Sequence, residues 1–255
     1  MSKNTKKKKL VAAIACRNDG TRLYGKPLQN LCVEDKVSIL DNIINCLSTI
    51  ETISELVLGV AEGKENDIYH DYALEKGIHS ISGDKDDVLS RLIKCGEKIN
   101  ASDIFRITSE SPFPSFDNIE EAWKLHNKNS ADATFLDDIV DGCNFEIIRL
   151  EALKISHKKG NSKHRSEFCS LYIRENIKDF IVNKIETDKK LFRKDLRLTV
   201  DNPEDLVVCR NIFSEFKKMA PRIPLVEIIE FLDNNPDLIK LTLPFVEEGY
   251  RTMYL

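Results

Sequence analysis

The sequence lacks the features that mark several classes of protein. Its seven cysteines form no Cys-x-x-Cys pair, and its five histidines show no His-x-x-x-His spacing, so a zinc site is not indicated. No apolar run reaches the roughly 20 residues that a membrane-spanning helix needs. An odd number of cysteines without pairing motifs is typical of reduced thiols, mostly buried as small apolar side chains, and predicts a cytoplasmic location.

The charge is nearly balanced, with 38 Lys and Arg against 42 Asp and Glu and a formal net charge of −4. No global field therefore favours nucleic acid or a membrane as a partner, and any anion site must be local. The lysine run Lys6–Lys9 is not followed by the apolar stretch of a signal peptide, so we interpret residues 1–9 as a solvated basic tail. A chain of 255 residues is long enough for one large α/β domain.

Short apolar, β-branched segments alternate along the chain with segments that carry apolar residues at helical spacing. The expected strands are Val11–Cys16, Glu55–Val60, Ile78–Ser82, Ile104–Thr108 and Ala133–Leu136. The expected helices are Ile39–Thr49, Asn66–Lys76, Val88–Ile99 and Phe116–Asn127, with His126 at the surface or as a cap. This alternation predicts an α/β fold, a Rossmann-like doubly wound and mostly parallel sheet, with ligands at the carboxyl ends of the strands.

From residue 141 to residue 195 the alternation changes. Here we expect two strands and a helix, at Asn144–Ile148, Phe180–Ile185 and Arg165–Glu175. A strand over Leu196–Val200 then leads to a helix over Pro203–Lys217, with Asn202 as its N-cap. We place a main domain at residues 10–220, with 141–195 as an inserted αβ region. Residues 221–255 follow as a helical extension, with helices over Leu225–Leu232 and Pro236–Val246.

The loop after the first expected strand combines two glycines with three cations. It reads Arg17-Asn18-Asp19-Gly20-Thr21-Arg22-Leu23-Tyr24-Gly25-Lys26. Glycine lets the backbone approach an anion, while guanidinium and ammonium groups neutralise a polyphosphate. The composition indicates a phosphate cradle in which Gly20 and Thr21 contact the nucleotide, and a solvated basic loop is the alternative.

This loop and three later segments resemble the CTP-dependent sugar cytidylyltransferases. That family includes the acylneuraminate and 3-deoxy-manno-octulosonate cytidylyltransferases and the spore-coat-polysaccharide type. The pattern Arg-x-x-x-Thr-Arg-x-x-Gly-Lys-Pro-Leu at residues 17–28 is similar to its nucleotide loop. Further matches follow in the family's order at Ser82–Arg91, Arg106–Pro112 and Leu196–Leu206. The resemblance covers residues 10 to 215, and four motifs in register make it specific.

The resemblance implies transfer of CMP from CTP to an acidic sugar, a nonulosonate or another 2-keto acid, with release of pyrophosphate. It assigns Arg17, Arg22 and Lys26 to the triphosphate, and it assigns Glu110 and Asp201 to a bridging Mg²⁺. The family has Gly-Asp where this chain has Ser109-Glu110, so Glu110 must fold back or bind the metal through water. A role in capping the following helix is the alternative for Asp201.

The resemblance also places Gly83 and Asp84 near the cytosine and ribose. Arg106 and the segment His164-Arg165-Ser166-Glu167 are polar groups expected to meet the acceptor sugar, although the family's Arg-Glu-His-x-Thr motif is not kept in this segment. The inserted region is expected to lie over the sugar and to pack against a second subunit, which predicts a homodimer.

Three other functions stay open. One is nucleotidyl transfer with another NTP or acceptor. Another is a glycosyltransferase that uses the Asp-x-Asp of Asp84 and Asp86, although such an enzyme has no use for a loop with three cations. The third is a homologue that binds a nucleotide without activity. This alternative stays open because Glu110 stands where the family has Asp.

Overall fold

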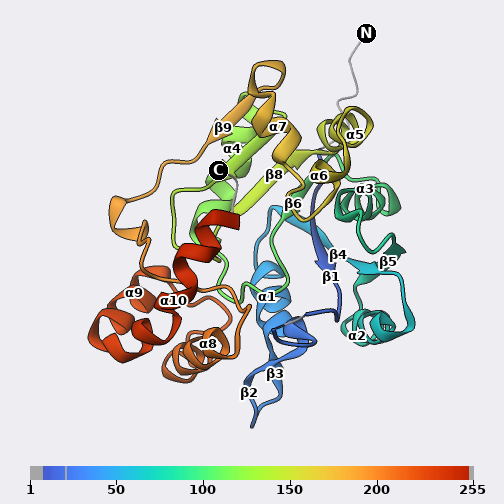
Figure 1. The fold of residues 1–255 in the computed structure, drawn as a ribbon. Helices are drawn as coiled ribbons and strands as arrows, with labels where there is room; N and C mark the ends of the chain where they lie inside the picture. The colour runs from blue at the N-terminus through green and yellow to red at the C-terminus, as the bar shows by residue number, and fades with distance from the viewer. Residues whose placement is uncertain (1–7, 21, 253–255) are drawn as a thin grey trace.

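Seven strands form one sheet through the middle of the protein (Figure 1). The computed structural model describes residues 8–20 and 22–252. In spatial order the strands are β5 (His79–Gly83), β4 (Ile53–Ala61), β1 (Leu10–Cys16), β6 (Asp103–Arg106), β8 (Phe145–Arg149), β7 (Ala133–Leu136) and β9 (Val182–Lys184). β8 runs antiparallel to both neighbours, and the other strand pairs are parallel. The expected mostly parallel sheet is confirmed.

Alternate residues of β1 pack on opposite faces of the sheet. Leu10, Ala12 and Ile14 belong to the larger apolar core, whereas Val11 and Ala13 belong to a smaller core on the other face. Because both faces are covered, the strand reads as a nearly continuous apolar run, as is typical of parallel sheets with helical crossovers.

Helices build both cores against the sheet. The larger core is completed by α1 (Ile39–Leu47), α2 (Ile68–Lys76), α4 (Ile119–Lys128), α8 (Pro203–Glu215) and α9 (Leu225–Asn234). The smaller core is completed by α3 (Val88–Lys98), α5 (Leu150–Lys159) and α7 (Leu171–Glu175). The helix expected from residue 165 begins only at Leu171 and follows the short α6 (Ser162–Arg165).

Every expected strand but one agrees with the structure within two residues at each end. The segment Leu196–Val200 is not a strand and forms only an isolated bridge between Arg197 and Asp141. Its extended backbone is used instead to bring the Arg197 side chain into a buried cluster of carboxylates. The helix α5 and the hairpin of β2 (Asn30–Cys32) and β3 (Val37–Ser38) were not expected.

Residues 141–195 do not form a region apart from the sheet. β8 lies between β6 and β7 and is almost wholly buried, while β9 pairs with β7 at the sheet edge. The expected inserted strands are thus part of the main sheet, because the apolar residues of β8 pack into both cores. Whether this region also meets a second subunit stays a prediction.

His126 does not lie at the surface as expected. It is fully buried where α4 crosses the sheet. Its Nδ1 lies 2.8 Å from Thr134 Oγ1 on β7, and its Nε2 lies 3.0 Å from Asp103 Oδ1 on β6. The two strands supply polar partners beneath the helix, so the ring is buried without losing its hydrogen bonds.

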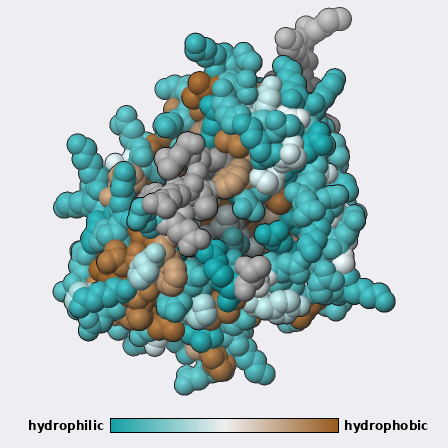
Figure 2. Space-filling view, viewed as in Figure 1, coloured by the Kyte–Doolittle hydropathy of each residue, from teal (hydrophilic) through white to brown (hydrophobic). Residues whose placement is uncertain are grey.

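The two helices expected in the C-terminal extension are present as α9 and α10 (Pro236–Thr252). Apolar surface gathers over them (Figure 2), with Val226, Leu241 and Leu243 exposed. All seven cysteines are free thiols, and six of them are buried. Within residues 8–20 and 22–252, no helix has both the length and the apolar character needed to cross a membrane.

The expected basic tail is described only at its end. Residues 1–7 lie outside the described residues, as does Thr21 of the loop after β1. Lys9 is held in place, because its ammonium pairs with Glu55 and donates to the Ile99 carbonyl at 2.8 Å. These contacts fix the start of β1.

Candidate active site

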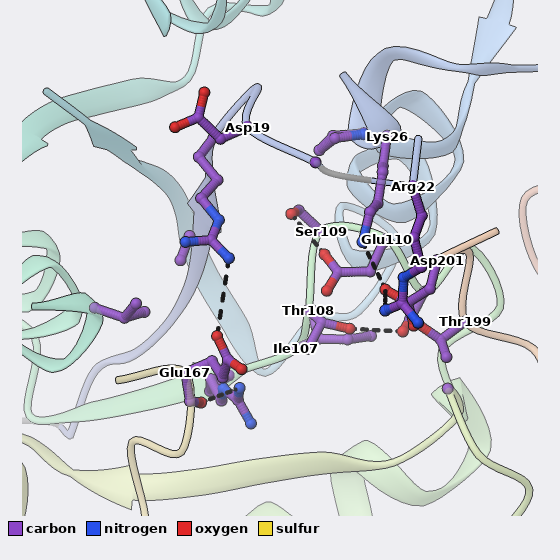
Figure 3. A pocket seen from close by; sticks show the side chains of 18 of the residues that line it. Asp19, Arg22, Lys26, Ile107, Thr108, Ser109, Glu110, Glu167, Thr199 and Asp201 are labelled. Carbon is purple, nitrogen blue, oxygen red and sulfur yellow. Dashed lines mark hydrogen bonds and ion pairs between the residues drawn. The ribbon is translucent and has the colours of Figure 1, made fainter. Parts of the chain in front are cut away.

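A cavity of about 810 Å³ opens where β1 and β6 end. Its walls come from the loop after β1, the loop after β6, α3, and the chain segments around residues 141–144, 167–168, 197–201 and 245. Figure 3 shows the charged side chains that point into it. The site lies at the carboxyl ends of parallel strands, as the alternation of strands and helices predicts.

The loop after β1 depends on its two glycines. Gly25 adopts a left-handed backbone conformation with a φ of 58°, and its N–H donates to the Asn18 carbonyl at 3.0 Å. A Cβ at Gly20 would lie 2.0 Å from the carbonyl oxygen of Leu23. The resulting tight loop lets Arg17, Arg22 and Lys26 all line the same cavity.

Three cationic side chains of the site pair with the Asp201 carboxylate. Lys26 Nζ lies 2.6 Å from its Oδ1, Arg22 Nη2 lies 3.7 Å from the same oxygen, and Arg197 pairs with Oδ2. Burial opposes ionisation of Asp201, but the charge of Lys26, together with Arg197 and Arg22, holds the pKa of this carboxyl below its ordinary value. Asp201 is therefore a carboxylate in the resting site.

Capping of α8 is done by Asp205 and Asn202, not by Asp201. The Asp205 carboxylate accepts the backbone N–H of Asp201 at 2.9 Å and that of Asn202 at 2.8 Å. The buried Arg197 donates to Asp141 at 2.9 Å and to Asp205 at 3.3 Å. These contacts orient the turn before the helix, so that the Asp201 side chain faces Lys26 and the cavity.

In Figure 3, Glu110 lies between Glu167 on one side and the cluster of Lys26, Arg22 and Asp201 on the other. Its backbone carbonyl accepts the N–H of Val200 at 2.9 Å, which ties the loop after β6 to the segment that carries Asp201. Ser109 Oγ donates to its carboxylate at 3.0 Å. Burial raises the pKa of Glu110, and the charge of nearby Asp201 adds to the rise, while Lys26 opposes it.

Arg17 and Arg106 face the cavity from its other flank. Arg17 Nη2 lies 3.9 Å from the Glu167 carboxylate, and Arg106 Nη2 donates to the Glu167 carbonyl at 2.7 Å. Arg106 Nη1 lies 3.3 Å from the buried carboxylate of Glu146, which Arg174 also contacts at 3.0 Å. A buried network thus holds Arg106 from below while its guanidinium lines the cavity.

Arg91 is a cavity residue to which the sequence analysis assigned no role. Only 1% of the residue is exposed, and its Nη1 donates to the Cys16 carbonyl at 3.4 Å, while its Nε has no hydrogen-bond partner in the described part of the chain. Among the described residues, no carboxylate pairs with it. Gly83 makes room for its stem, since a Cβ there would lie 2.8 Å from Arg91 Cγ. The sequence feature that could have identified Arg91 as a site residue is its position at the end of the Ser82–Arg91 motif.

A family model described as cytidylyltransferase matches residues 11–237, which include all the charged residues of the site described above. The chain belongs to the cytidylyltransferase family. It is thus a nucleotidyltransferase that uses CTP. The resemblance inferred from four motifs is confirmed.

Individual relatives agree with this assignment. The chain is 25% identical over 226 residues to the spore coat polysaccharide biosynthesis protein SpsF of Bacillus subtilis, covering 88% of this chain and 94% of SpsF. A cytidylyltransferase structure from Leptospira borgpetersenii superposes with a TM-score of 0.82 at 21% identity, covering 91% and 97% of the chains. A CMP:2-keto-3-deoxy-manno-octonic acid synthetase complexed with CTP superposes at 0.59 with 13% identity, covering 81% and 99%. At these identities the two structures show the shared fold.

The carboxylates of this cytidylyltransferase suit a metal that is shared with a substrate. No group of three or more Asp, Glu, His or Cys side chains able to hold a metal occurs in the described part of the chain. Mg²⁺ is commonly bound by one or two carboxylates together with substrate phosphates and water. Glu110 and Asp201 are two such carboxylates, which line one cavity and are joined through the hydrogen bond from Val200 to the Glu110 carbonyl, so they fit this kind of site.

Gly83 and Asp84, expected beside the nucleotide base, are not among the described residues that line the cavity. The Asp84 carboxylate accepts the backbone N–H of Asp86 at 2.8 Å and that of Asp87 at 2.9 Å, and so closes the turn before α3. Gly83 acts through Arg91, for which it leaves space. Of the segment expected to meet the acceptor, Glu167 lines the cavity, whereas His164, Arg165 and Ser166 do not. The other expected site residues among those described line the cavity, namely Arg17, Gly20, Arg22, Lys26, Arg106, Glu110 and Asp201.

Proposed function

We propose that this cytidylyltransferase transfers CMP from CTP to a hydroxyl of an acidic sugar, a nonulosonate or another 2-keto acid, for the synthesis of a surface polysaccharide or glycan. The observation that carries the proposal is the position of Lys26 at the end of the glycine-containing loop. Its ammonium pairs with Asp201, and Glu110 lines the same cavity. The names of the relatives, a polysaccharide biosynthesis protein and a synthetase for a CMP-activated keto acid, support this class of acceptor.

The reaction needs positioning and charge neutralisation more than covalent help from the protein. The acceptor oxygen forms a bond to the α-phosphorus, the bond from that phosphorus to the bridging oxygen breaks, and pyrophosphate leaves. The hydroxyl proton is lost to solvent. Arg17, Arg22 and Lys26 stabilise the charge that develops on the leaving pyrophosphate. Lys26 then exchanges its contact with Asp201 for one with a phosphate oxygen.

Glu110 and Asp201 would hold Mg²⁺, the proposed cofactor. The ion supplies Lewis-acid polarisation of the α-phosphate when it is bound. Asp201 is kept ionised by its cations, so it is ready to bind a metal without first losing a proton. Glu110 is the weaker acid, and the approach of a divalent cation favours its carboxylate form.

Arg91 supports the choice of CTP over other pyrimidine nucleotides. It lines the cavity beside the apolar side chains of Ala15, Val88 and Leu92, which suit the faces of a base. Cytosine offers two neighbouring acceptors, N3 and O2, to a guanidinium, whereas uracil carries a hydrogen on N3. A buried guanidinium with a spare N–H therefore favours cytosine.

The direct test measures pyrophosphate release from each of the four ribonucleoside triphosphates, with Mg²⁺ and a panel of sugars that includes neutral hexoses and 2-keto acids. Release only with CTP and an acidic sugar is expected. Release with another triphosphate or a neutral sugar would redirect the assignment within nucleotidyltransferases. A nucleoside diphosphate formed from a sugar nucleotide would indicate a glycosyltransferase, and CTP binding without turnover would indicate a homologue without activity.

A further inference from the structure

The helix α10 brings a residue from beyond the matched family segment into the site. The family model ends at residue 237, whereas α10 continues to Thr252. Phe245 on this helix lines the cavity together with Asn144, Thr199 and Asp201. The roles proposed for the charged side chains do not account for this aromatic ring, because a phenylalanine neither neutralises phosphate nor binds a metal.

The helix that carries Phe245 is held firmly on the side of the nearby α8. Leu238 and Ile239 pack against the larger core, and Thr242 is only 2% exposed. Leu243, two residues before Phe245, is 51% exposed and does not line the cavity. Because α8 starts two residues after Asp201, the support of Phe245 and the position of the expected metal ligand belong to one structural unit.

Phe245 and Arg91 lie on opposite flanks of the cavity. Arg91 belongs to α3 and Phe245 to α10, and these helices stand on either side of the strand ends in Figure 1. The loop after β1 and the carboxylates Glu110 and Asp201 line the same cavity. If the base lies at Arg91 and the phosphates lie at the loop, the acceptor must enter on the side of Phe245.

We propose that Phe245 is a specificity-determining residue for the acceptor, against which an apolar part of the sugar packs. An aromatic ring offers the C–H groups of a pyranose face or of an acyl substituent a contact that water cannot replace. Asn144 and Thr199 line the same cavity and supply hydrogen-bonding groups for hydroxyls. The acceptor class is thus an acidic sugar that also carries an apolar face or acyl group. This inference rests on the proposed function.

The test compares the full-length wild type with Phe245→Ala and Phe245→Leu, with Leu243→Ala as the matched control on the same helix. Calorimetric titration with CTP and Mg²⁺ measures nucleotide affinity. Steady-state assays with N-acetylneuraminate and 3-deoxy-manno-octulosonate measure the KM for the acceptor. We expect Phe245→Ala to raise that KM by about tenfold or more, Phe245→Leu to raise it less, and CTP affinity to stay within about twofold. Leu243→Ala should behave as the wild type.

Equal loss of CTP affinity and acceptor affinity in Phe245→Ala, or an unchanged acceptor KM, would overturn the role of Phe245 while leaving cytidylyl transfer intact. Thermal denaturation of each variant shows whether a loss reflects unfolding, and Phe245→Leu keeps the comparison valid if the alanine variant does not fold. A wild type that binds CTP but transfers CMP to no sugar would instead contradict the proposed function, and with it this inference.

Discussion

At the scale of single residues, the charged side chains of the site form ion pairs with one another. In the proposed reaction, the phosphates of the substrate replace these partners. Lys26 and Asp201 are 2.6 Å apart, and both side chains are largely buried. Arg17 likewise pairs with Glu167 across the cavity entrance. In the proposed reaction, substrate phosphates compete for the same cations, and the ion pairs of this structure hold these side chains near the positions proposed for them.

Lys26→Ala is expected to lower turnover by at least about 100-fold, because loss of one preorganised charge stabiliser commonly costs about 3 kcal/mol. Pyrophosphate release with CTP measures the effect. Lys124→Ala, at an exposed position of α4, is the control and should retain full activity. A folded Lys26→Ala protein with turnover near that of the wild type would rule out the phosphate cradle.

Glu110 and Asp201 are expected to act as a unit on one Mg²⁺. Each alanine variant should lose Mg²⁺-stimulated activity, and the double variant should be little worse than the more damaged single one. Glu110→Asp should keep or raise activity if the shorter carboxylate of the family reaches the same ion. The measurement is turnover against Mg²⁺ concentration, and additive losses with unchanged Mg²⁺ dependence would separate the two carboxylates.

Arg91→Gln is expected to reduce the preference for CTP over UTP by about tenfold or more, because a neutral amide that accepts as well as donates no longer distinguishes the two bases. Competition binding with the two nucleotides measures the ratio. In the wild type, a CTP analogue with carbon in place of N3 should bind more weakly than CTP. Equal binding of the analogue and CTP would show that Arg91 does not contact N3.

At the scale of secondary structure elements, the helices around the site begin at side chains that close their first turn. The first turn of α1 is closed by Ser38 and Asp41, whose side chains exchange hydrogen bonds with each other's backbone N–H groups at 3.0 and 2.9 Å. Lys76 and Tyr72 of α2 contact the other oxygen of Asp41 at 2.7 and 2.8 Å. One carboxylate therefore ties two neighbouring helices together.

This carboxylate predicts a stability that depends on pH. Burial opposes ionisation of Asp41, but Lys76, Ser38 and Tyr72 hold its pKa below the ordinary value. The stabilisation is therefore fully present above the ordinary Asp pKa of about 3.9 and is lost as pH falls through the lower folded-state pKa. Asp41→Asn should cost about 2 kcal/mol at pH 7. Urea denaturation at pH 7 and pH 3 should show that difference shrinking, and an equal difference at both pH values would contradict it.

At the scale of the whole molecule, β9 leaves one edge of the sheet without a strand partner in the described chain. Ile177 and Ile181, beside this edge, are 49% and 52% exposed. Open strand edges with apolar neighbours are commonly covered by a partner. We propose that a second copy covers this edge, which keeps the expected homodimer through residues 141–195.

Light scattering should give the mass of two chains for the wild type. Ile177→Lys combined with Ile181→Lys should give the mass of one chain, because two buried charges would oppose each other across a two-fold interface. Leu74→Lys, at an exposed position on α2, is the control and should leave the assembly unchanged. A wild-type protein with the mass of one chain and full activity would contradict the proposed homodimer.

Most strands and helices, and the glycine-containing cationic loop after β1, were predictable from local sequence. Apolar periodicity depends only on neighbours along the chain, so the strand at Val11–Cys16 and the helix at Val88–Ile99 were predictable within a residue. The meeting of Arg17, Lys26 and Glu110 at one cavity also followed, since parallel strands bring their carboxyl ends to the same edge.

Which distant segments pair was not predictable from local sequence and is seen in the folded protein. The position of β8 between β6 and β7, the burial of His126 and the pairing of Arg197 with Asp141 all depend on contacts between residues far apart in sequence. The same holds for Phe245, which reaches the cavity only because α10 packs on α8. Local patterns do not encode such partners, because a buried polar group is stable only where the fold supplies a complement.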